Sequence, residues 1–231
     1  MTLASAPAAI VFDAYGTIFD VYAVAARLEA LWPGKGRAIA EKWREKQIEY
    51  SRLRTISDRY VDFWAITADA LDYSLEFARA AASAEARASL LSAYETLPPH
   101  PEVPAALRAL AARGLPLAVL SNGAEAMLSA VLEASALRSL FAHVLSVDRV
   151  RKFKTAPEAY RLAPDAFGRP ASELLFVSSN GWDAVGAAWF GYSVFWINRA
   201  NAPAERLDAP PFAIGRTMSD LVDFVEKGCA G

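Results

Sequence analysis

The sequence contains very little cysteine and histidine. Of its 231 residues, one is a cysteine, Cys229, and two are histidines, His100 and His143. A single cysteine cannot form a disulfide within the chain, which favours a reducing compartment and therefore a cytoplasmic protein. Neither histidine lies in a cluster of metal-ligand type, so a histidine-based metal site is not expected. His143, in "LFAHVLSV", is expected in the core or at a strand edge.

An excess of charge and long apolar runs are also missing. The net charge is -2, from 24 basic and 26 acidic residues, so no basic footprint for nucleic acid is present. No apolar run approaches the roughly 20 residues that span a bilayer. The opening segment lacks a basic start, and Asp13 interrupts its apolar run too early for a signal peptide. The composition, 54% hydrophobic and 22% charged, is typical of a globular protein.

Strand and helix patterns alternate over much of the chain. Strands are expected at 8–13, 115–122, 141–147, 174–180 and 193–198, and helices at 124–135, 156–168, 182–191 and 218–227. Such alternation predicts right-handed βαβ units. The expected fold class is therefore α/β, with a doubly wound parallel sheet.

A block of helical patterns without a strand pattern separates the first strand from the others. Helices are expected at 24–33, 37–56, 57–75 and 83–97, and the stretch "PPHPEVP" ends the block. Ser83 is the expected N-cap of the last of these helices, and Glu85 places an acid in its first turn. We predict an inserted all-helical domain at 19–96, with the core formed by 1–18 and 97–231.

Polar side chains follow four of the expected strands. They are Asp13, Ser121 with Asn122, Asp148, and Ser178 with Ser179 and Asn180; the segments beyond add Thr17, Lys154 and Asp183. A charge such as Asp13 directly after a buried run is costly unless it is paired. Each residue alone is common at a turn, but ligands of open parallel sheets bind beyond the carboxyl ends of the strands. Together these residues predict a site at that edge.

Four motifs carry a family resemblance. "DAYGT", "SNG", "KTAPEAY" and "SSNGWD" occur in the order and spacing of the haloacid dehalogenase superfamily, and the chain closely resembles its L-2-haloacid dehalogenase branch over nearly its whole length. The resemblance implies a Rossmann-like core with an inserted helical cap, no metal, no cofactor and a homodimer. Phosphatases of this superfamily have a second aspartate where this chain has Tyr15. "SSNGWD" also offers few carboxylates to a divalent cation.

The resemblance implies a nucleophile and a halide site. Asp13 would attack carbon and form an ester while halide leaves without needing a proton. Lys154 would keep Asp13 ionised, although its setting in "RVRKFK" also fits a solvated loop lysine. Arg44, Asn122 and Trp182 would bind the halide. Without the resemblance, Arg44 in "EKWREKQ" resembles an ordinary exposed helix residue, and its neighbour Trp43 resembles core.

Further residues are implied around the substrate and the ester. Ser121 and the backbone N–H groups near Ala14 and Tyr15 would hold the substrate carboxylate. The pocket walls would be Tyr15, Ile48, Phe63 and Trp182, with plain packing as the alternative for Phe63. Asp183 would orient or activate water, with Ser178, Asn180 and Lys154 nearby. Thr17 and Tyr160 also fall on site positions, and Thr17 could alternatively cap a helix after Gly16.

The expected function is conversion of (S)-2-haloalkanoic acids to (R)-2-hydroxy acids and halide through an aspartyl ester. Attack from behind carbon inverts that centre. Three alternatives remain open from the sequence: a magnesium-dependent phosphatase of the same fold, a non-catalytic carboxylate-binding or scaffold protein, and a hydrolase of another activated carboxylate, such as a fluoroacid or a strained-ring amino acid. The expected partner is a small-molecule substrate, with no nucleic acid and no membrane.

Overall fold

A parallel sheet forms the centre of the computed structural model of the chain, which describes residues 6–228. The strands are β1 (Ala9–Phe12), β2 (Leu117–Ser121), β3 (His143–Ser146), β4 (Leu174–Ser178), β5 (Ser193–Ile197) and β6 (Ala213–Gly215). Their order in the sheet is β3-β2-β1-β4-β5-β6, and every neighbouring pair is parallel. The first strand of the chain therefore lies inside the sheet, between β2 and β4. This confirms the expected doubly wound α/β class.

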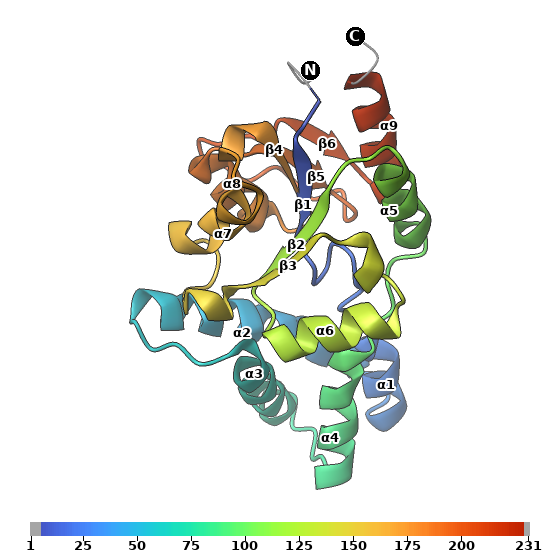
Figure 1. Ribbon diagram of the computed structural model, residues 1–231. Coiled ribbons are helices and arrows are strands. Elements are labelled where there is room, and N and C mark those ends of the chain that lie inside the picture. The colour runs from blue at the N-terminus through green and yellow to red at the C-terminus, as the bar shows by residue number, and fades with distance from the viewer. Residues whose placement is uncertain (1–5, 229–231) are drawn as a thin grey trace.

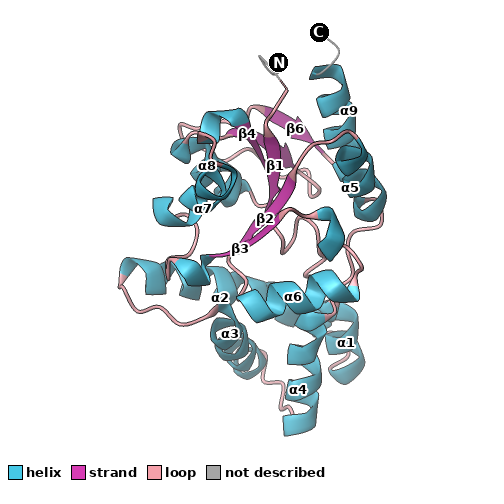
Figure 2. Cartoon of the chain, in the orientation of Figure 1, coloured by secondary structure: helices cyan, strands magenta, loops and turns pink. Residues whose placement is uncertain are grey.

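Helices cover both faces of the sheet (Figures 1 and 2). The helices α5 (Val103–Ala112) and α9 (Met218–Gly228) lie on one side, and α7 (Pro157–Phe167) and α8 (Gly181–Phe190) lie on the other. Side chains of β1 alternate between the two cores. Ile10 and Phe12 pack in the cluster of α5 and α9, whereas Ala9 and Val11 pack in that of α7 and α8. Burial on both faces explains why β1 is apolar throughout.

The helical cap lies beyond the carboxyl ends of the strands, opposite the two termini (Figure 1). It comprises α1 (Val24–Leu31), α2 (Gly36–Ile56), α3 (Phe63–Phe77) and α4 (Ala84–Ser92). The helix α6 (Glu125–Ala134), which follows β2, runs along the side of the core that faces the cap. The two chain segments that join cap and core lie side by side, because the N–H of Asp20 donates to the carbonyl oxygen of Pro98 at 2.9 Å.

The helical block differs in detail from the expectation. Residues 57–62 are not helical, because Asp62 is extended and its side chain accepts the N–H of Ala65 at 2.8 Å, which starts α3 at Phe63. Ser83 is confirmed as the N-cap of α4, where it accepts the N–H of Ala86 at 3.2 Å. That helix ends at Ser92 and continues as a short 3-10 turn rather than to residue 97.

Two elements were not anticipated. The helix α5 begins at Val103, inside the proline-rich stretch, because a proline is tolerated in the first helical turn. The strand β6 is three residues long at the edge of the sheet.

Several single-residue expectations can also be compared with the structure. Trp43 is fully buried, as expected. His143 opens β3 and packs edge-on against the ring of Phe167, which confirms its place in a strand. Cys229 lies outside the described residues. Within residues 6–228, no helix has the length and apolar character needed to cross a membrane.

Candidate active site

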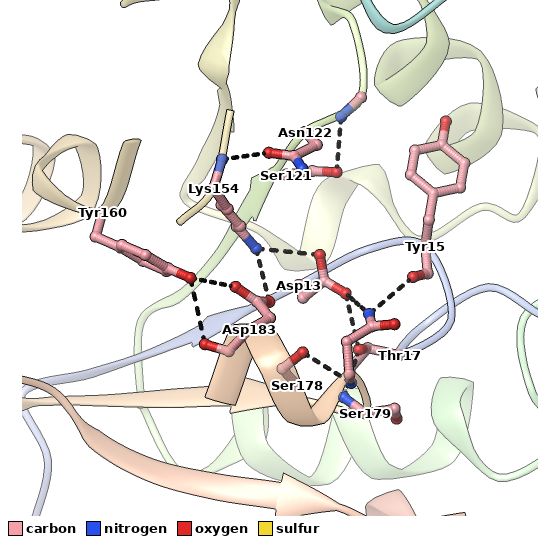
Figure 3. A network of polar contacts seen from close by, with 12 residues as sticks. Asp13, Tyr15, Thr17, Ser121, Asn122, Lys154, Tyr160, Ser178, Ser179 and Asp183 are labelled. Carbon is pink, nitrogen blue, oxygen red and sulfur yellow. Dashed lines mark hydrogen bonds and ion pairs between the residues drawn. The ribbon is translucent and has the colours of Figure 1, made fainter. Parts of the chain in front are cut away.

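The carboxylate of Asp13 lies at the carboxyl end of β1, between loops that follow β3 and β4 (Figure 3). The side chain is buried and is held by three donors. Its Oδ1 lies 3.1 Å from Nζ of Lys154, and its Oδ2 accepts from Oγ1 of Thr17 at 3.0 Å and from Nδ2 of Asn180 at 2.9 Å. A buried charge needs this compensation. The partners of Asp13 are therefore a lysine, a hydroxyl and an amide, and the lysine is the residue that the resemblance implied.

Lys154 is a buried residue and not a solvated loop lysine. It is 1% exposed, and its Nζ lies 3.0 Å from Oδ2 of Asp183 as well as beside Asp13. Its backbone N–H donates to Oδ1 of Asn122 at 2.8 Å. One ammonium thus lies between two carboxylates (Figure 3), and the lysine is held at both its backbone and its side chain.

Asp183 lies in the first turn of α8 and is fully buried. Its Oδ1 accepts from the hydroxyl of Tyr160 at 2.7 Å, so both carboxylate oxygens have partners. Burial raises the pKa of Asp183, and the ammonium of Lys154 offsets only part of this effect. Burial also raises the pKa of Tyr160, with the charge of Asp183 adding to it. Tyr160 therefore remains a protonated donor at neutral pH.

Thr17 and Ser178 position their neighbours. The hydroxyl of Thr17 donates to Asp13 and accepts the N–H of Ser179 at 2.8 Å. The alternative in which Thr17 caps a helix is wrong, because the next helix begins at Val24. The hydroxyl of Ser178 accepts the N–H of Asn180 at 3.1 Å, which orients the loop that carries the asparagine.

A small, partly enclosed pocket lies against Asp13. Its volume is about 10 Å³, room for roughly one water molecule. The residues that line it come from both cap and core: Asp13, Tyr15, Arg44, Ile48, Ser51, Phe63, Ser121, Asn122 and Trp182. The pocket thus brings together the residues expected at the halide and substrate sites, with the exception of Ala14. Lys154, Asp183, Thr17, Ser178, Asn180 and Tyr160 form a polar layer behind it.

Arg44 reaches the pocket from α2. It is 8% exposed, and its Nη2 donates to the carbonyl oxygen of Tyr15 at 3.2 Å and to Oδ1 of Asn180 at 3.5 Å. The exposed-face alternative is therefore wrong. Ile48 and Ser51 follow Arg44 at helical spacing and share its face. Ser51 was not anticipated, although its spacing from Arg44 is a signal that could have found it.

Several hydrogen-bond donors at the pocket have no acceptor. Within residues 6–228, neither the backbone N–H of Ala14 nor that of Tyr15 donates a hydrogen bond. Ser121 uses its oxygen to accept the N–H of Gly123 at 3.0 Å, which leaves its hydroxyl hydrogen available. Asn122 uses its oxygen for the N–H of Lys154, which leaves its amide nitrogen available. Donors of this kind suit an anionic ligand.

Three aromatic side chains complete the wall of the pocket. The ring of Tyr15 stacks on that of Phe63 with centroids 6.3 Å apart, and its hydroxyl is buried without a partner. Burial raises the pKa of Tyr15, so this side chain is neutral. Phe63 therefore lines the pocket and also packs against the core. Trp182 lies under the guanidinium of Arg52, 5.0 Å from its ring centroid.

One polar strand end lies outside the pocket. Asp148 follows β3 but accepts from the hydroxyl of Tyr60 and from the N–H of Glu125. It therefore joins cap to core and is not a ligand-facing residue. Over the part of the chain that the structure describes, no three histidine, cysteine, aspartate or glutamate side chains are grouped as a metal site.

Comparison with known sequences supports this arrangement. Residues 7–191 match the family model of haloacid dehalogenase-like hydrolases. An (S)-2-haloacid dehalogenase of Pseudomonas sp. strain YL is 45% identical over 217 residues, which cover 94% of this chain and 94% of that protein. Haloacetate dehalogenase H-2 of Moraxella sp. strain B is 43% identical over 217 residues, covering 94% and 97%.

Solved structures agree with this result. The crystal structure of an L-2-haloacid dehalogenase superposes with a TM-score of 0.93 at 51% identity, covering 94% of this chain and 98% of the other. The L-2-haloacid dehalogenase of Xanthobacter autotrophicus, with chloropropionic acid covalently bound, superposes with a TM-score of 0.88 at 37% identity, covering 95% and 98%.

Proposed function

The chain belongs to the haloacid dehalogenase-like hydrolases and is a hydrolytic dehalogenase of (S)-2-haloacids; from its site we propose how it breaks the carbon–halogen bond. One observation carries the proposal. The buried carboxylate of Asp13 lies against Lys154 and faces a small pocket whose cap side carries Arg44. A carboxylate nucleophile, a cation that keeps it ionised and a second cation across the pocket are what displacement of a halide requires.

In the first step, a carboxylate oxygen of Asp13 attacks C2 of the substrate from the side opposite the halogen. A carbon–oxygen bond forms, and the electrons of the carbon–halogen bond leave with the halide. Arg44, Asn122 and Trp182 receive the developing anion, where donors of this type typically contribute a few kcal/mol each. Halide needs no proton to depart, so Tyr15 can occupy the position at which a phosphatase of this fold needs an acid.

The substrate carboxylate is held at the same time by Ser121 and by the backbone N–H groups of Ala14 and Tyr15. Their available hydrogens support this assignment. The rings of Tyr15 and Phe63, together with Ile48, enclose the substituent on C2. The Moraxella relative is itself named a haloacetate dehalogenase, which supports short acids as substrates.

In the second step, water attacks the carbonyl carbon of the aspartyl ester. The acyl carbon–oxygen bond breaks, one proton of the water passes to the leaving oxygen and the other is released to solvent. The carboxylate of Asp13 is regenerated, and the hydroxy acid leaves with an oxygen that came from Asp13. Asp183 orients or activates the water together with Lys154, Ser178 and Asn180. The geometry favours an action of Asp183 through the lysine, because both of its oxygens already have partners. Inversion at C2 gives the (R)-2-hydroxy acid.

A chloride-release assay tests the function. Purified protein is incubated with (S)-2-chloropropionate and excess chelator, and chloride and the enantiomer of lactate are measured. We expect chloride and (R)-lactate in equal amounts. Absence of chloride, together with phosphate-ester hydrolysis on addition of Mg²⁺, would instead establish the phosphatase.

Isotope labelling tests the covalent step. In ¹⁸O-labelled water, the label is expected in Asp13 after the first turnover and in the product of later turnovers. Label that enters the product but never Asp13, even over repeated cycles, would refute the aspartyl ester.

The setting of the enzyme is part of the proposal. We propose a cytoplasmic homodimer with a core of residues 1–18 and 97–231 and a cap of residues 19–96. The single cysteine supports a reducing compartment. The hydrogen bond between Asp20 and Pro98, where the chain enters and leaves the cap, supports the domain boundaries. Tyr73 and Phe77, two exposed aromatic side chains that stack at the end of α3, support an interface between copies. Analytical ultracentrifugation measures the oligomeric state, and a monomer at micromolar concentration would rule out the dimer.

A further inference from the structure

The residue before Lys154 is held by the cap. Phe153 is fully buried in the core loop that precedes α7, yet its backbone N–H donates to Oγ1 of Thr55, in the last turn of α2, at 3.0 Å. Its ring stacks on that of Tyr60 with centroids 5.0 Å apart, and it lies 6.1 Å from the ring of Phe63. Backbone and side chain of one core residue thus both depend on the cap.

Two successive backbone N–H groups fix the lysine in place. The N–H of Phe153 is bound by a cap side chain, Thr55, and the N–H of Lys154 is bound by a core side chain, Asn122, at 2.8 Å. The ammonium then reaches Asp13 at 3.1 Å and Asp183 at 3.0 Å. A shift of this segment would move the ammonium relative to both carboxylates.

The same helix also contributes to the pocket. Arg44, Ile48 and Ser51 line it from α2, and Thr55 is the next residue at helical spacing. Docking of this one helix against the core therefore completes the halide side of the pocket and orders the segment that carries the lysine.

We propose that Thr55 is a positioning residue: its hydroxyl, by holding Phe153, sets Lys154 against Asp13 only when the cap is docked. This inference rests on the proposed function, because it gives Lys154 its role there. Thr55 touches neither substrate nor nucleophile. Its effect passes through the backbone of the next segment, and the loss of its hydroxyl is expected to reduce turnover more than substrate binding.

The kinetic test compares Thr55→Val, which keeps the shape and removes the hydroxyl, with Thr55→Ser, which keeps the hydroxyl. We expect Thr55→Val to lower kcat about tenfold to a hundredfold with KM changed less than about twofold, and Thr55→Ser to restore kcat to within about threefold. Asp58→Asn is the matched control. It removes an exposed ion pair with Lys152 at the same interface, and its kcat should stay within about twofold.

A pH profile separates positioning from a merely structural role. The charge of Lys154 lowers the pKa of Asp183 against the effects of burial and of Asp13. When the ammonium moves away, the pKa of Asp183 rises, so the acidic limb of kcat should shift to higher pH in Thr55→Val and stay in place in Asp58→Asn. An unshifted limb in Thr55→Val would overturn the inference.

A crystal structure of the Thr55→Val variant gives a readout that does not need turnover. We expect the distance from Nζ of Lys154 to Oδ1 of Asp13 to lengthen from 3.1 Å. An unchanged distance, or a kcat equal to that of Asp58→Asn, refutes the role of Thr55. If the wild-type protein releases no chloride, the proposed function is contradicted instead. The Lys154–Asp13 distance in the Thr55→Val crystal structure still tests the role of Thr55 in that case. Thr55→Ala replaces Thr55→Val if the latter does not fold.

Discussion

At the scale of single residues, the site depends on a group of charges that are buried together and paired. Asp13, Lys154 and Asp183 together carry two negative charges and one positive charge with almost no exposure. Removing one partner of a buried ion pair typically costs about 3–5 kcal/mol, because the other charge is left uncompensated. Thr17, Asn180 and Tyr160 supply the hydrogen bonds that reduce this cost. The same contacts that stabilise the group also orient the nucleophile.

The sharpest prediction at this scale concerns the nucleophile. Asp13→Asn is expected to reduce chloride release below detection, because an amide oxygen is a far weaker nucleophile than a carboxylate. Lys154→Ala is expected to lower the rate nearly as far. Chloride release by the folded variants is the measurement, with mass spectrometry to show that the introduced asparagine has not been hydrolysed back to aspartate. Full activity of the Asp13→Asn variant with its asparagine intact would place the nucleophile elsewhere.

A second prediction concerns pH. Burial raises the pKa of Asp183 above that of an ordinary aspartate, so its protonated form persists to higher pH. Protonated Asp183 cannot pair with the ammonium of Lys154 or accept a proton from water, so kcat should fall as the pH decreases through this raised pKa. A kcat profile from pH 3.5 to 8, with stability checked at each pH, measures it. A profile that stays flat down to the ordinary aspartate range, near 3.8, would contradict this role.

At the scale of elements, α2 and α3 carry the cap side of the pocket. Arg44, Ile48 and Ser51 come from one face of α2, and Phe63 is the first residue of α3. The start of α3 is fixed by Asp62, whose side chain accepts the N–H of Ala65. The N-cap of α3 therefore determines the position of Phe63 in the pocket wall.

This capping gives a prediction with a matched control. Asp62→Ala and Ser83→Ala each remove an N-cap, of α3 and α4 respectively, and each should lower the free energy of unfolding by about 1 kcal/mol. Only Asp62→Ala should also raise KM, because α4 contributes no residue to the pocket. Urea denaturation and steady-state kinetics on both variants measure the two effects. Equal KM values would show that the cap of α3 does not position Phe63.

At the scale of the whole molecule, the site lies where the cap meets the core. The space beside Asp13 holds roughly one water molecule, and it adjoins a larger cavity of about 520 Å³ that shares Arg44, Ile48 and Trp182 with it. Contacts between cap and core hold this region together, among them Arg44 to the carbonyl of Tyr15, Thr55 to Phe153 and Tyr60 to Asp148. A space this small excludes bulk water, which strengthens every charge interaction inside.

A prediction on global stability concerns a contact away from the pocket. Glu102, at the start of α5, accepts from Arg199 and from the N–H of Met218, the first residue of α9. Although burial acts to raise it, the pKa of Glu102 is lowered by these hydrogen bonds. Because this pKa is lowered, the stabilisation of the folded state by ionised Glu102 is fully present above the unfolded pKa near 4.5. That stabilisation is lost as the pH falls through the folded pKa.

Glu102→Gln should therefore lower the free energy of unfolding at pH 7 by about 1–3 kcal/mol. Near pH 3 the variant and the wild type should unfold at similar denaturant concentrations. Denaturation at both pH values measures this, and a difference that persists at pH 3 would show that the charge of Glu102 is not the cause.

The sequence by itself determined the α/β class, the position of the strands and the residue types at the strand ends, because apolar periodicity and capping are local properties. With the family motifs it also singled out Asp13 and Lys154, whose side chains the structure brings together. It did not anticipate β6, which is three residues long, too short to give an apolar pattern, and pairs with β5 at the sheet edge.

Only the tertiary structure decided which of these residues meet. By spacing alone, Arg44 resembled an exposed helix residue, Lys154 resembled a solvated lysine and Asp148 resembled a site residue. In the folded chain, Arg44 and Lys154 are buried and Asp148 contacts Tyr60 of the cap. The same packing places Ser51 in the pocket and Thr55 against Phe153. The physical reason is that burial and partners are set by contacts between distant segments, and no local pattern encodes which helix docks on which loop.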